Sequence, residues 1–432
     1  MMSDLAWLQE RFGPEGIADD ERTLAAHAIG DMRPTVVVSP PDAQGVADTL
    51  RWASEHGLAV VPWGGGTQQA AMLAPERYDL ALRTGRLREV IEYEPAELVI
   101  TVEAGITVSE LAEILAPHQQ FLPVTVPQPQ RATIGGLIAT NAAGPERLHY
   151  GAMRDLVLGV TVALTDGSLI RGGGRVVKNV AGYDLTRLFN GSWGTLGVIT
   201  AASLRLSPVP AVRRTLVMRC ASWEGAQEAA LALYHSRLGP QGLTIAPIDS
   251  MGGGTLDSLE LLIRFGGLPT TVERQMAEAQ KLAEEAGARL DRILEGKEEA
   301  TLWIQLVERA HQAPGVHLQA SVLPSQVAEA VHVLSEIADA HGWPSYPLAH
   351  AGAGTVLTAW DAPGDAPLAE AISTARTHLR VLGGWLFIRR APPQKAPLDY
   401  WGETTPGARP LMRRIKEELD PAGILNPGRF LV

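Results

Sequence analysis

Two glycine-rich segments have the composition of a phosphate-binding site. The first, Gly64-Gly65-Gly66-Thr67, directly follows Leu58 to Pro62, a run typical of a strand. The second, Thr133-Ile134-Gly135-Gly136, opens a small apolar run typical of a helix start. Glycine lets the backbone approach a phosphate closely and adopt positive φ, so successive N–H groups can form an anion nest. The two segments predict a cradle for the pyrophosphate of a dinucleotide.

Other phosphate-binding motifs fit these segments poorly. Neither segment has the G-x-G-x-x-G spacing of a Rossmann fold, and the acidic ribose partner expected about 20 residues further on is missing. The G-x-x-x-x-G-K-[ST] pattern of a P-loop does not occur. A triple glycine alone can also be only a tight turn. The interpretation therefore depends on both segments and on the motifs that accompany them.

Composition narrows the class of protein. The chain has 432 residues, of which 46% are hydrophobic and 20% charged, enough for two or three domains with sizeable cores. A net charge of -11 argues against a nucleic-acid groove or an anionic membrane surface as the main partner. Cys220 is the only cysteine, so this chain alone carries no internal disulfide, cysteine zinc site or iron–sulfur cluster.

The N-terminus lacks the basic stretch and apolar run of a signal peptide, and no run has the length of a transmembrane helix. We therefore expect a cytoplasmic protein, associated with a membrane only through a partner.

The elements around the glycine segments indicate how they are positioned. Val36-Val37-Val38 is typical of a strand, Asp42 of a helix cap, and the strand that follows this helix ends at the first glycine loop. Pro208 and Pro210 then mark a domain boundary. Strands and long helices alternate beyond it, as in an antiparallel sheet backed by helices. A last helix over residues 409–419 and a compact turn over 420–428 are expected to pack back on the first domain.

The motifs up to residue 206 resemble those of flavoenzymes with a vanillyl-alcohol-oxidase-type FAD domain, and the resemblance returns at residues 420–430. Within that family the chain is most similar to the FAD-binding subunit of bacterial glycolate oxidase that accompanies the catalytic flavoprotein. That similarity depends on residues 174–185 and on Trp193, where catalytic relatives usually carry glutamate. The stretches that carry the family resemblance are Val61-Pro62-Trp63-Gly64-Gly65-Gly66-Thr67, Ala132-Thr133-Ile134-Gly135-Gly136, Asn141-Ala142-Ala143-Gly144, Tyr150-Gly151, Gly182-Tyr183-Asp184-Leu185 and residues 191–199.

The resemblance implies an α+β fold and a bound FAD. The FAD-binding domain, of the two-part PCMH type, would span residues 1–208, an antiparallel-sheet cap domain 209–400, and a segment returning to the FAD domain 401–432. Thr67-Gln68-Gln69 holds no histidine, so the FAD is expected to be non-covalent. The residues that the resemblance assigns to FAD are Pro62, Trp63, Gly64, Gly65, Gly66, Thr67, Gln68, Pro127, Thr133, Ile134, Gly135, Gly136, Asn141, Ala143, Gly144, Tyr150, Gly151, Asp155, Gly194, Gly197, Val198 and Ile199, with Val198 and Ile199 at the adenine end.

The substrate end departs from the pattern of the relatives. D-Lactate and D-2-hydroxyglutarate dehydrogenases hold a metal with a histidine pair in H-x-G-D-G-N-L-H and a later G-E-H-G. Here His350 remains, Leu357 replaces the second histidine, and no Gly-Glu-His-Gly occurs, so we predict no metal. The Leu302-Trp303-Ile304-Gln305 stretch also lacks the arginine that reads the substrate carboxylate. Arg389 or Arg390 could replace that arginine.

Oxidation of an α-hydroxy acid needs a cation for the carboxylate and a base for the hydroxyl proton. Lys178 and His350 are the candidate catalytic residues, each with an alternative structural role: a surface ion pair for Lys178 and a histidine on the sheet for His350. Tyr183 is expected to pack in the core rather than to act as an acid.

Three functions follow from these residues and from the resemblance. The first is an FAD-carrying subunit that oxidises a 2-hydroxy acid, glycolate or D-lactate, in a complex with a second flavoprotein subunit and an iron–sulfur subunit. The second is a self-sufficient, metal-free FAD-dependent alcohol or hydroxy-acid dehydrogenase. The third is a non-catalytic flavin-binding assembly subunit.

Overall fold

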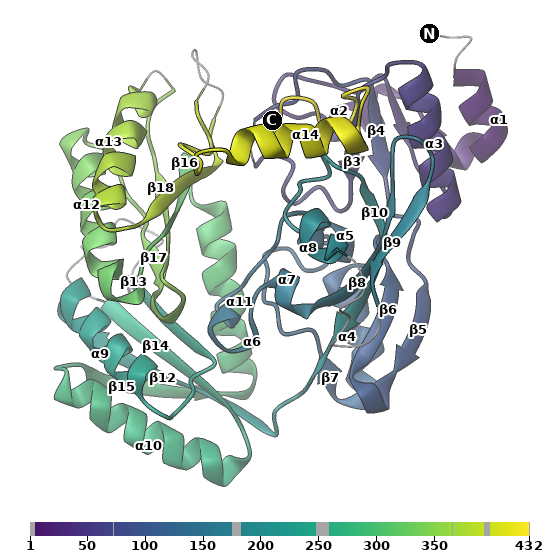
Figure 1. Cartoon of the computed structure of the whole chain (residues 1–432). Coiled ribbons are helices and arrows are strands. Elements are labelled where there is room, and N and C mark those ends of the chain that lie inside the picture. The colour runs from purple at the N-terminus through teal and green to yellow at the C-terminus, as the bar shows by residue number, and fades with distance from the viewer. Residues whose placement is uncertain are drawn as a thin grey trace.

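The first lobe of the chain contains two sheets of different kinds (Figure 1). The computed structural model describes residues 5–71, 73–174, 183–247, 259–364, 366–392 and 398–431. Within these residues, one sheet has the order β1-β2-β4-β3 and the other the order β5-β6-β10-β8-β9. Their strands are β1 (Ile17–Ala18), β2 (Val36–Val38), β3 (Val60–Trp63), β4 (Leu80–Arg83), β5 (Val90–Glu94), β6 (Val99–Glu103), β8 (Val157–Ala163), β9 (Leu169–Gly173) and β10 (Val198–Arg205).

The smaller sheet positions the first glycine segment. Strands β2 and β3 both pair in parallel with β4, and the apolar run of β2 is buried at every position, as in a parallel sheet covered on both faces. Helix α3 (Ala43–Glu55) begins at Asp42, whose carboxylate accepts a hydrogen bond from Gly45 N at 2.7 Å. Its buried face packs on this sheet together with α1 (Leu5–Gly16). Strand β3 therefore delivers the glycines at its carboxyl end.

The larger sheet of the first lobe is antiparallel and supports the second glycine segment. Helix α4 (Val108–Leu115) begins with a capping box between Thr107 and Glu110. Helix α5 (Ile134–Ala139) is short because Asn141, at φ 48°, turns the chain out of the helix. The remaining elements of this lobe are α2 (Glu21–Ala26), α6 (Arg147–Tyr150), α7 (Met153–Leu156), α8 (Leu185–Phe189) and the paired strands β7 (Gln120–Phe121) and β11 (Ser207–Pro208).

The second lobe is built on one antiparallel sheet (Figure 1). In the described part of the chain its order is β15-β12-β14-β13-β17-β18-β16-β19. The strands are β12 (Val212–Cys220), β13 (Gly242–Pro247), β14 (Leu259–Gly267), β15 (Arg289–Glu295), β16 (Val316–Ser321), β17 (Leu348–His350), β18 (Thr355–Trp360) and β19 (Trp385–Arg390).

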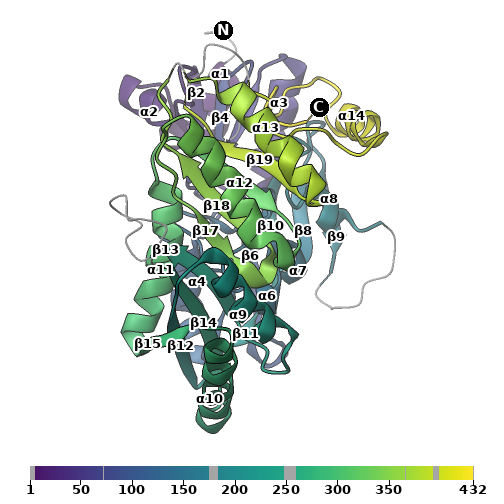
Figure 2. The same cartoon turned by 90° about the vertical axis from the view of Figure 1, so that its left-hand side faces the viewer.

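Helices cover the two faces of this sheet unequally. Figure 2 shows the outer face, where α9 (Trp223–His235), α10 (Pro269–Glu285), α12 (Val327–Ala340) and α13 (Leu368–Val381) pack over the strands and bury the main core of the lobe. Helix α11 (Gly296–Gln312) packs on the inner face, where Trp303 and Leu306 contact Val217 and Leu262. The inner face beyond α11 is left open toward the first lobe.

The chain returns to the first lobe at its C-terminal end. Helix α14 (Ala408–Leu419) crosses between the lobes (Figure 1). After it, Leu425 forms a parallel bridge with Val60 of β3, and Asn426 N donates to Val60 O at 2.9 Å. This segment therefore extends the sheet that carries the first glycine segment. None of the described helices is long and apolar enough to cross a membrane.

Candidate functional site

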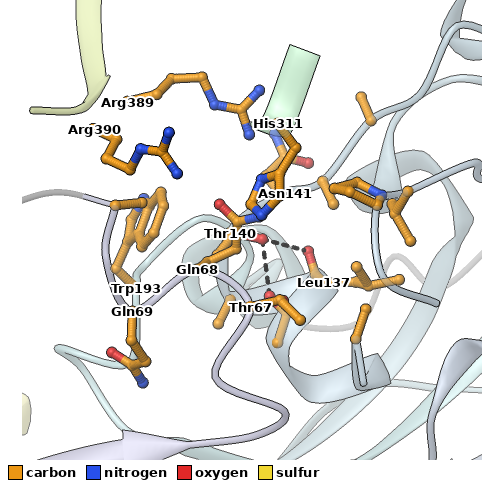
Figure 3. Close-up of a pocket in the computed structure, with 18 of the residues that line it drawn as sticks. Thr67, Gln68, Gln69, Leu137, Thr140, Asn141, Trp193, His311, Arg389 and Arg390 are labelled. Carbon is orange, nitrogen blue, oxygen red and sulfur yellow. Dashed lines mark hydrogen bonds between the residues drawn. The ribbon is translucent and has the colours of Figure 1, made fainter. Parts of the chain in front are cut away.

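A cavity of about 670 Å³ lies between the two lobes. The loops after β3 and around α5 line it from the first lobe, and α11 with strands β16 to β19 line it from the second. Figure 3 shows Thr67, Gln68 and Trp193 on one side and His311, Arg389 and Arg390 on another. The cavity thus joins the predicted cofactor residues to the predicted substrate residues.

The first glycine segment has no room for side chains. A Cβ on Gly64 would lie 2.1 Å from Thr133 Oγ1, and one on Gly65 would lie 1.6 Å from Arg131 O. Gly66 has φ +72°, a conformation that favours glycine. The N–H groups of Gly64 to Thr67 have no hydrogen-bond partner among the described residues. They are the free donors of an anion nest beside the cavity.

The second glycine segment supports this nest rather than extending it. The N–H groups of Ile134 and Gly135 donate to Ile106 O and Ala104 O at 3.0 and 2.8 Å. Gly136 N donates to Thr133 Oγ1, which caps α5. The expectation that these N–H groups are available to the pyrophosphate therefore fails, because the fold already uses them. Thr133, Gly135 and Gly136 nonetheless line the cavity.

Most of the other predicted cofactor residues also line the cavity. Asn141 and Trp193 both have positive φ, 48° and 55°, and Trp193 O accepts a hydrogen bond from Asn426 Nδ2 at 2.7 Å. Gly197 packs so closely on β8 that a Cβ would lie 2.5 Å from Val162 Cγ1. The predicted residues that line the cavity are Pro62, Trp63, Gly64, Gly65, Gly66, Thr67, Gln68, Pro127, Thr133, Gly135, Gly136, Asn141, Ala143, Gly144, Gly194, Gly197, Val198 and Ile199.

Four predicted cofactor residues lie outside the cavity lining. Ile134 is fully buried in the core beneath α5. Tyr150 accepts a hydrogen bond from Gln241 Nε2 of the second lobe at 3.0 Å, so its hydroxyl joins the two lobes. Gly151 has φ +87° next to Asp155, whose carboxylate accepts from Ala152 N at 2.9 Å and caps α7. The structure gives these residues packing and capping roles.

Two residues discussed from the sequence lie elsewhere. Lys178, one of the two catalytic candidates, lies outside the described residues. The expectation that Tyr183 packs in the core is wrong, because its side chain is 93% exposed. Leu185 is the residue of this stretch that packs inward, against Gly172 of β9.

His350, the other catalytic candidate, lines the cavity from the end of β17. It is buried, and its Nδ1 lies 3.0 Å from Thr244 Oγ1 of β13. Burial lowers the pKa of His350 to about 4; the charge of Glu146 raises this pKa to a lesser extent than burial lowers it, and the charges of Arg389 and Arg147 lower it further. The ring is therefore neutral near pH 7, the state that a base needs, and burial makes it a weaker base than an exposed histidine.

Arg389 and Arg390 reach the cavity from β19. Arg390 Nη2 donates to Ala313 O at 3.0 Å and lies 2.5 Å from His317 Nε2. The Arg389 side chain makes no hydrogen bond or ion pair within the described residues. Arg389 is half-buried and lines the cavity. Protein atoms surround its guanidinium, and this burial lowers its pKa. An arginine keeps its charge even so.

No aspartate or glutamate lines the cavity among the described residues. Its charged side chains are arginines, in a chain whose net charge is -11. His311 and His317 lie beside Arg390, and burial together with this arginine lowers the pKa of both histidines, that of His317 to about 4. The electrostatics of the cavity therefore favour anions.

The predictions from the sequence did not include two arginines that line the cofactor end of the cavity. Arg131 Nη2 donates to Gly65 O at 3.0 Å and lies at the glycine loop. Arg429 is buried and donates to Gln69 O and Ala71 O at 2.7 and 2.9 Å. Arg131 directly precedes the second glycine segment, which could have indicated it. Arg429 is far from the loop in sequence, and no local pattern indicates it.

None of the residues of the Leu302-Trp303-Ile304-Gln305 stretch lines the cavity. Trp303 is fully buried and donates to Thr215 Oγ1 at 2.9 Å. Further along α11, Leu306, Ala310 and His311 line the cavity, Leu306 and Ala310 from the helix face that also carries Trp303. The arginines that line the cavity from the second lobe, Arg389 and Arg390, come from β19, and Arg147 of α6 lines it from the first lobe.

The sequence of the chain is similar to those of known FAD-linked proteins. Residues 34–173 match the FAD binding domain family, and residues 209–360 and 400–430 match the C-terminal domain of FAD linked oxidases. The glycolate oxidase subunit GlcD of Bacillus subtilis is 29% identical over 97% of this chain and 94% of its own length. The D-lactate dehydrogenase of Archaeoglobus fulgidus is 30% identical over 100% of this chain and 99% of its own length.

Solved structures share the fold. An alkyldihydroxyacetonephosphate synthase superposes with a TM-score of 0.77 at 18% identity, over 100% of this chain and 86% of that one. A 4-ethylphenol oxidase from Gulosibacter chungangensis superposes with a TM-score of 0.75 at 17% identity, over 99% of this chain and 96% of that one. The fold and the site thus define an FAD-dependent oxidoreductase of the vanillyl-alcohol-oxidase type. The chain belongs to the FAD-linked oxidases.

The described residues fit FAD. The unpartnered N–H groups of the first glycine segment, and the space that a Cβ at Gly64 or Gly65 would fill, suit a pyrophosphate. At the substrate end His350 faces the cavity without a second histidine from β18, since Leu357 lines it instead. No group of three or more His, Cys, Asp or Glu side chains among the described residues could hold a metal ion.

Proposed function

We propose that this chain binds FAD non-covalently at the first glycine segment and oxidises a small 2-hydroxy acid at the other end of the same cavity. One observation carries the proposal: the unpaired guanidinium of Arg389 and the neutral imidazole of His350 face one cavity that contains no carboxylate in its described lining. The substrate class follows the names of the relatives, a glycolate oxidase subunit and a D-lactate dehydrogenase.

Each group has a role that its surroundings support. FAD supplies the acceptor for the hydride when it is bound. Arg389 holds the substrate carboxylate through paired N–H donors, because its guanidinium has no protein counter-ion among the described residues. In the tautomer whose Nδ1–H donates to Thr244 Oγ1, Nε2 of His350 carries the lone pair that takes the hydroxyl proton. Leu306 and Leu357 exclude water from this end of the cavity.

We also propose that the chain works in a complex with a second flavoprotein subunit and an iron–sulfur subunit. Cys220 is its only cysteine, so electrons that leave the flavin through a cluster need a partner that carries one. The similarity to a protein named as a subunit of glycolate oxidase supports a complex. Self-sufficient turnover and a purely assembling role remain the alternatives that the experiment separates.

The test begins with the purified chain. We expect a yellow protein that releases all its FAD on acid precipitation, and a colourless protein that takes up no FAD would contradict the shared premise. Under anaerobic conditions, flavin bleaching by glycolate or D-lactate indicates self-sufficient oxidation. Bleaching only after partner subunits are added indicates the complex. No bleaching under either condition indicates an assembling role.

Two substitutions test the assigned roles. Arg389→Gln should weaken substrate binding by roughly tenfold to a hundredfold, because a charge-assisted hydrogen bond is lost. His350→Gln should slow anaerobic flavin reduction by about 10²–10⁴-fold, because general-base catalysis contributes that much. Both are measured by stopped-flow absorbance at matched FAD content. His378→Gln, on the exposed side of α13, is the matched control. Wild-type reduction rates in both variants would refute these roles.

A further inference from the structure

A β-bulge directs two consecutive arginines into the cavity. In the ladder between β16 and β19, His317 pairs with Arg390 but Leu318 pairs with Ile388, so Arg389 is the extra residue. Successive residues of a regular strand point to opposite faces. Leu386 and Ile388 pack in the core on the helix-covered face, while Phe387 lines the cavity. Without the bulge, Arg390 would follow Leu386 and Ile388 into that core.

The bulge places Arg390 opposite His317, which itself lines the cavity. Both guanidiniums therefore lie at the same end of one cavity, next to His311 (Figure 3). Burial and then the charges of Arg390 and Arg389 lower the pKa of both His311 and His317, so the two positive charges act on the same end of the cavity. Neither Arg389 nor Arg390 has a carboxylate within ion-pair distance among the described residues. No carboxylate lines this cavity in the described part of the chain. Such an arrangement is costly unless an anion with matching charge occupies it.

One carboxylate does not account for both arginines. Arg390 is held in place, because its Nη2 donates to Ala313 O at 3.0 Å, beside His317 Nε2. Ala313 O also accepts a hydrogen bond from His317 Nε2 at 2.6 Å, so this nitrogen carries a hydrogen and is not an acceptor for Arg390. Nη1 and Nε of Arg390 have no partner in the described part of the chain. They are preoriented donors for a second anionic group.

We propose that Arg389 and Arg390 form a two-guanidinium site that selects 2-hydroxy acids carrying a second carboxylate over monocarboxylic ones. This inference rests on the proposed function for the assignment of the first carboxylate to Arg389. The second carboxylate binds Nη1 and Nε of Arg390. The carbon chain between the carboxylates lies along the apolar wall of Phe387 and Leu357.

Binding of acids that lack a hydroxyl tests the site without any turnover. Isothermal titration of the FAD-loaded chain compares diacids and monoacids of matched length, succinate with butyrate and glutarate with valerate. We expect the better diacid to bind at least about tenfold more tightly than its monoacid, since a second charge-assisted pair contributes that much. Equal affinities, or no binding of either diacid, would overturn the proposal.

Variants assign the selectivity to Arg390. Arg390→Gln should bring the diacid-to-monoacid affinity ratio close to one, whereas Arg389→Gln should weaken both acids. If Arg390→Gln loses FAD, Arg390→Lys keeps the charge without the planar fork and should lower the ratio only partly. Arg274→Gln, an exposed arginine on α10, is the charge-matched control. An unchanged ratio in both Arg390 variants contradicts the proposal.

A kinetic comparison separates this inference from the function on which it rests. Flavin reduction by D-lactate without any preference for D-malate would overturn the two-guanidinium site and leave the proposed oxidation standing. Selective diacid binding without reduction by any 2-hydroxy acid would keep the site and contradict the oxidation.

Discussion

Gly65 and Gly85 show how differently glycines in one lobe respond to a side chain. A Cβ on Gly65 would lie 1.6 Å from Arg131 O, a backbone atom, while a Cβ on Gly85 would find only the end of the flexible Arg83 side chain, at 3.8 Å. The first position is fixed by the contact between the two glycine segments. The second is open.

Gly65→Ala should therefore reduce FAD binding by about tenfold to a hundredfold. The loop must move to relieve the contact, and charge-assisted hydrogen bonds from its N–H groups to the pyrophosphate are lost. The FAD dissociation constant, measured by fluorescence titration of the apoprotein, checks this. Gly85→Ala should bind FAD as the wild type does. Equal affinity in the two variants would show that the loop is not the pyrophosphate site.

The buried histidines predict how stability depends on pH. The pKa values of His317 and His350 are lowered from 6.5 to about 4, so below pH 6.5 the unfolded chain binds protons that the folded chain does not. The free energy of unfolding should rise with pH between about 4 and 6.5, by on the order of 1–3 kcal/mol per histidine.

Urea titrations at several pH values measure this slope. His317→Asn removes one titrating group and should flatten the curve in that window, whereas His378→Asn, which alters an exposed side chain, should not. A slope that is unchanged in His317→Asn would mean that this histidine is protonated in the folded chain.

At the scale of elements, Arg429 ties the C-terminal segment to the loop that follows the glycines. It donates to Gln69 O, Ala71 O and Leu73 O and to the amide of Gln69, all within 2.9 Å. Burial lowers its pKa to about 10, so it stays charged. Arg429→Gln leaves buried carbonyls without a donor.

We expect Arg429→Gln to lower the free energy of unfolding by about 2–4 kcal/mol, since each buried unsatisfied carbonyl costs about 1–3 kcal/mol and neighbouring losses overlap. It should also weaken FAD binding, because the loop ends at the nest. Thermal unfolding with and without added FAD measures both effects. Arg413→Gln, exposed on α14, should change neither. A variant as stable as the wild type would show that water replaces the arginine.

The sequence predicted elements with local signals and missed those that depend on distant partners. Asp42 and the residues before Gly64 indicated the elements around the nest, because caps and turns act over a few residues. Helix α11 and strand β13 were not predicted. The strand is defined by its pairing with β14 and β17, which lie elsewhere in the sequence.

The difference between local signals and distant partners also explains which residues of the site could be predicted. The residues predicted for the cofactor lie in contiguous motifs, and most of them line the cavity. At the substrate end, Arg389 and Arg390 were alternatives in the sequence, and only the register of β19 against β16 brings both to the cavity. A bulge is a property of two strands together, so one strand cannot reveal it.

At the scale of the whole molecule, a buried ion network joins the two lobes. Arg264 of β14 donates to Glu146, which precedes α6 in the first lobe, at 2.7 Å and to Glu299 of α11 at 3.0 Å. All three side chains are at most 7% exposed. Thr125, which lines the cavity, donates to the same Glu146 oxygen. The network therefore connects the docking of the lobes to the wall of the site.

Arg264→Gln should destabilise the chain by about 3–5 kcal/mol, because it leaves two buried carboxylates without their cation. Chemical denaturation measures the loss, and Arg274→Gln provides an exposed arginine for comparison. If the network holds the lobes together, the variant should also unfold in two steps rather than one. A single transition at the wild-type midpoint would show that apolar packing alone docks the lobes.

The absence of carboxylates from the described lining of the cavity has a consequence for how fast ligands arrive. The molecule as a whole carries a net charge of -11, so a small anion is repelled from afar and attracted only near the arginines. Dissolved salt screens the distant repulsion, over a Debye length of about 8 Å at 0.15 M, more than it screens buried contacts. The association rate of an organic acid should therefore rise with ionic strength, opposite to the usual trend for oppositely charged partners. Its dissociation rate should change much less.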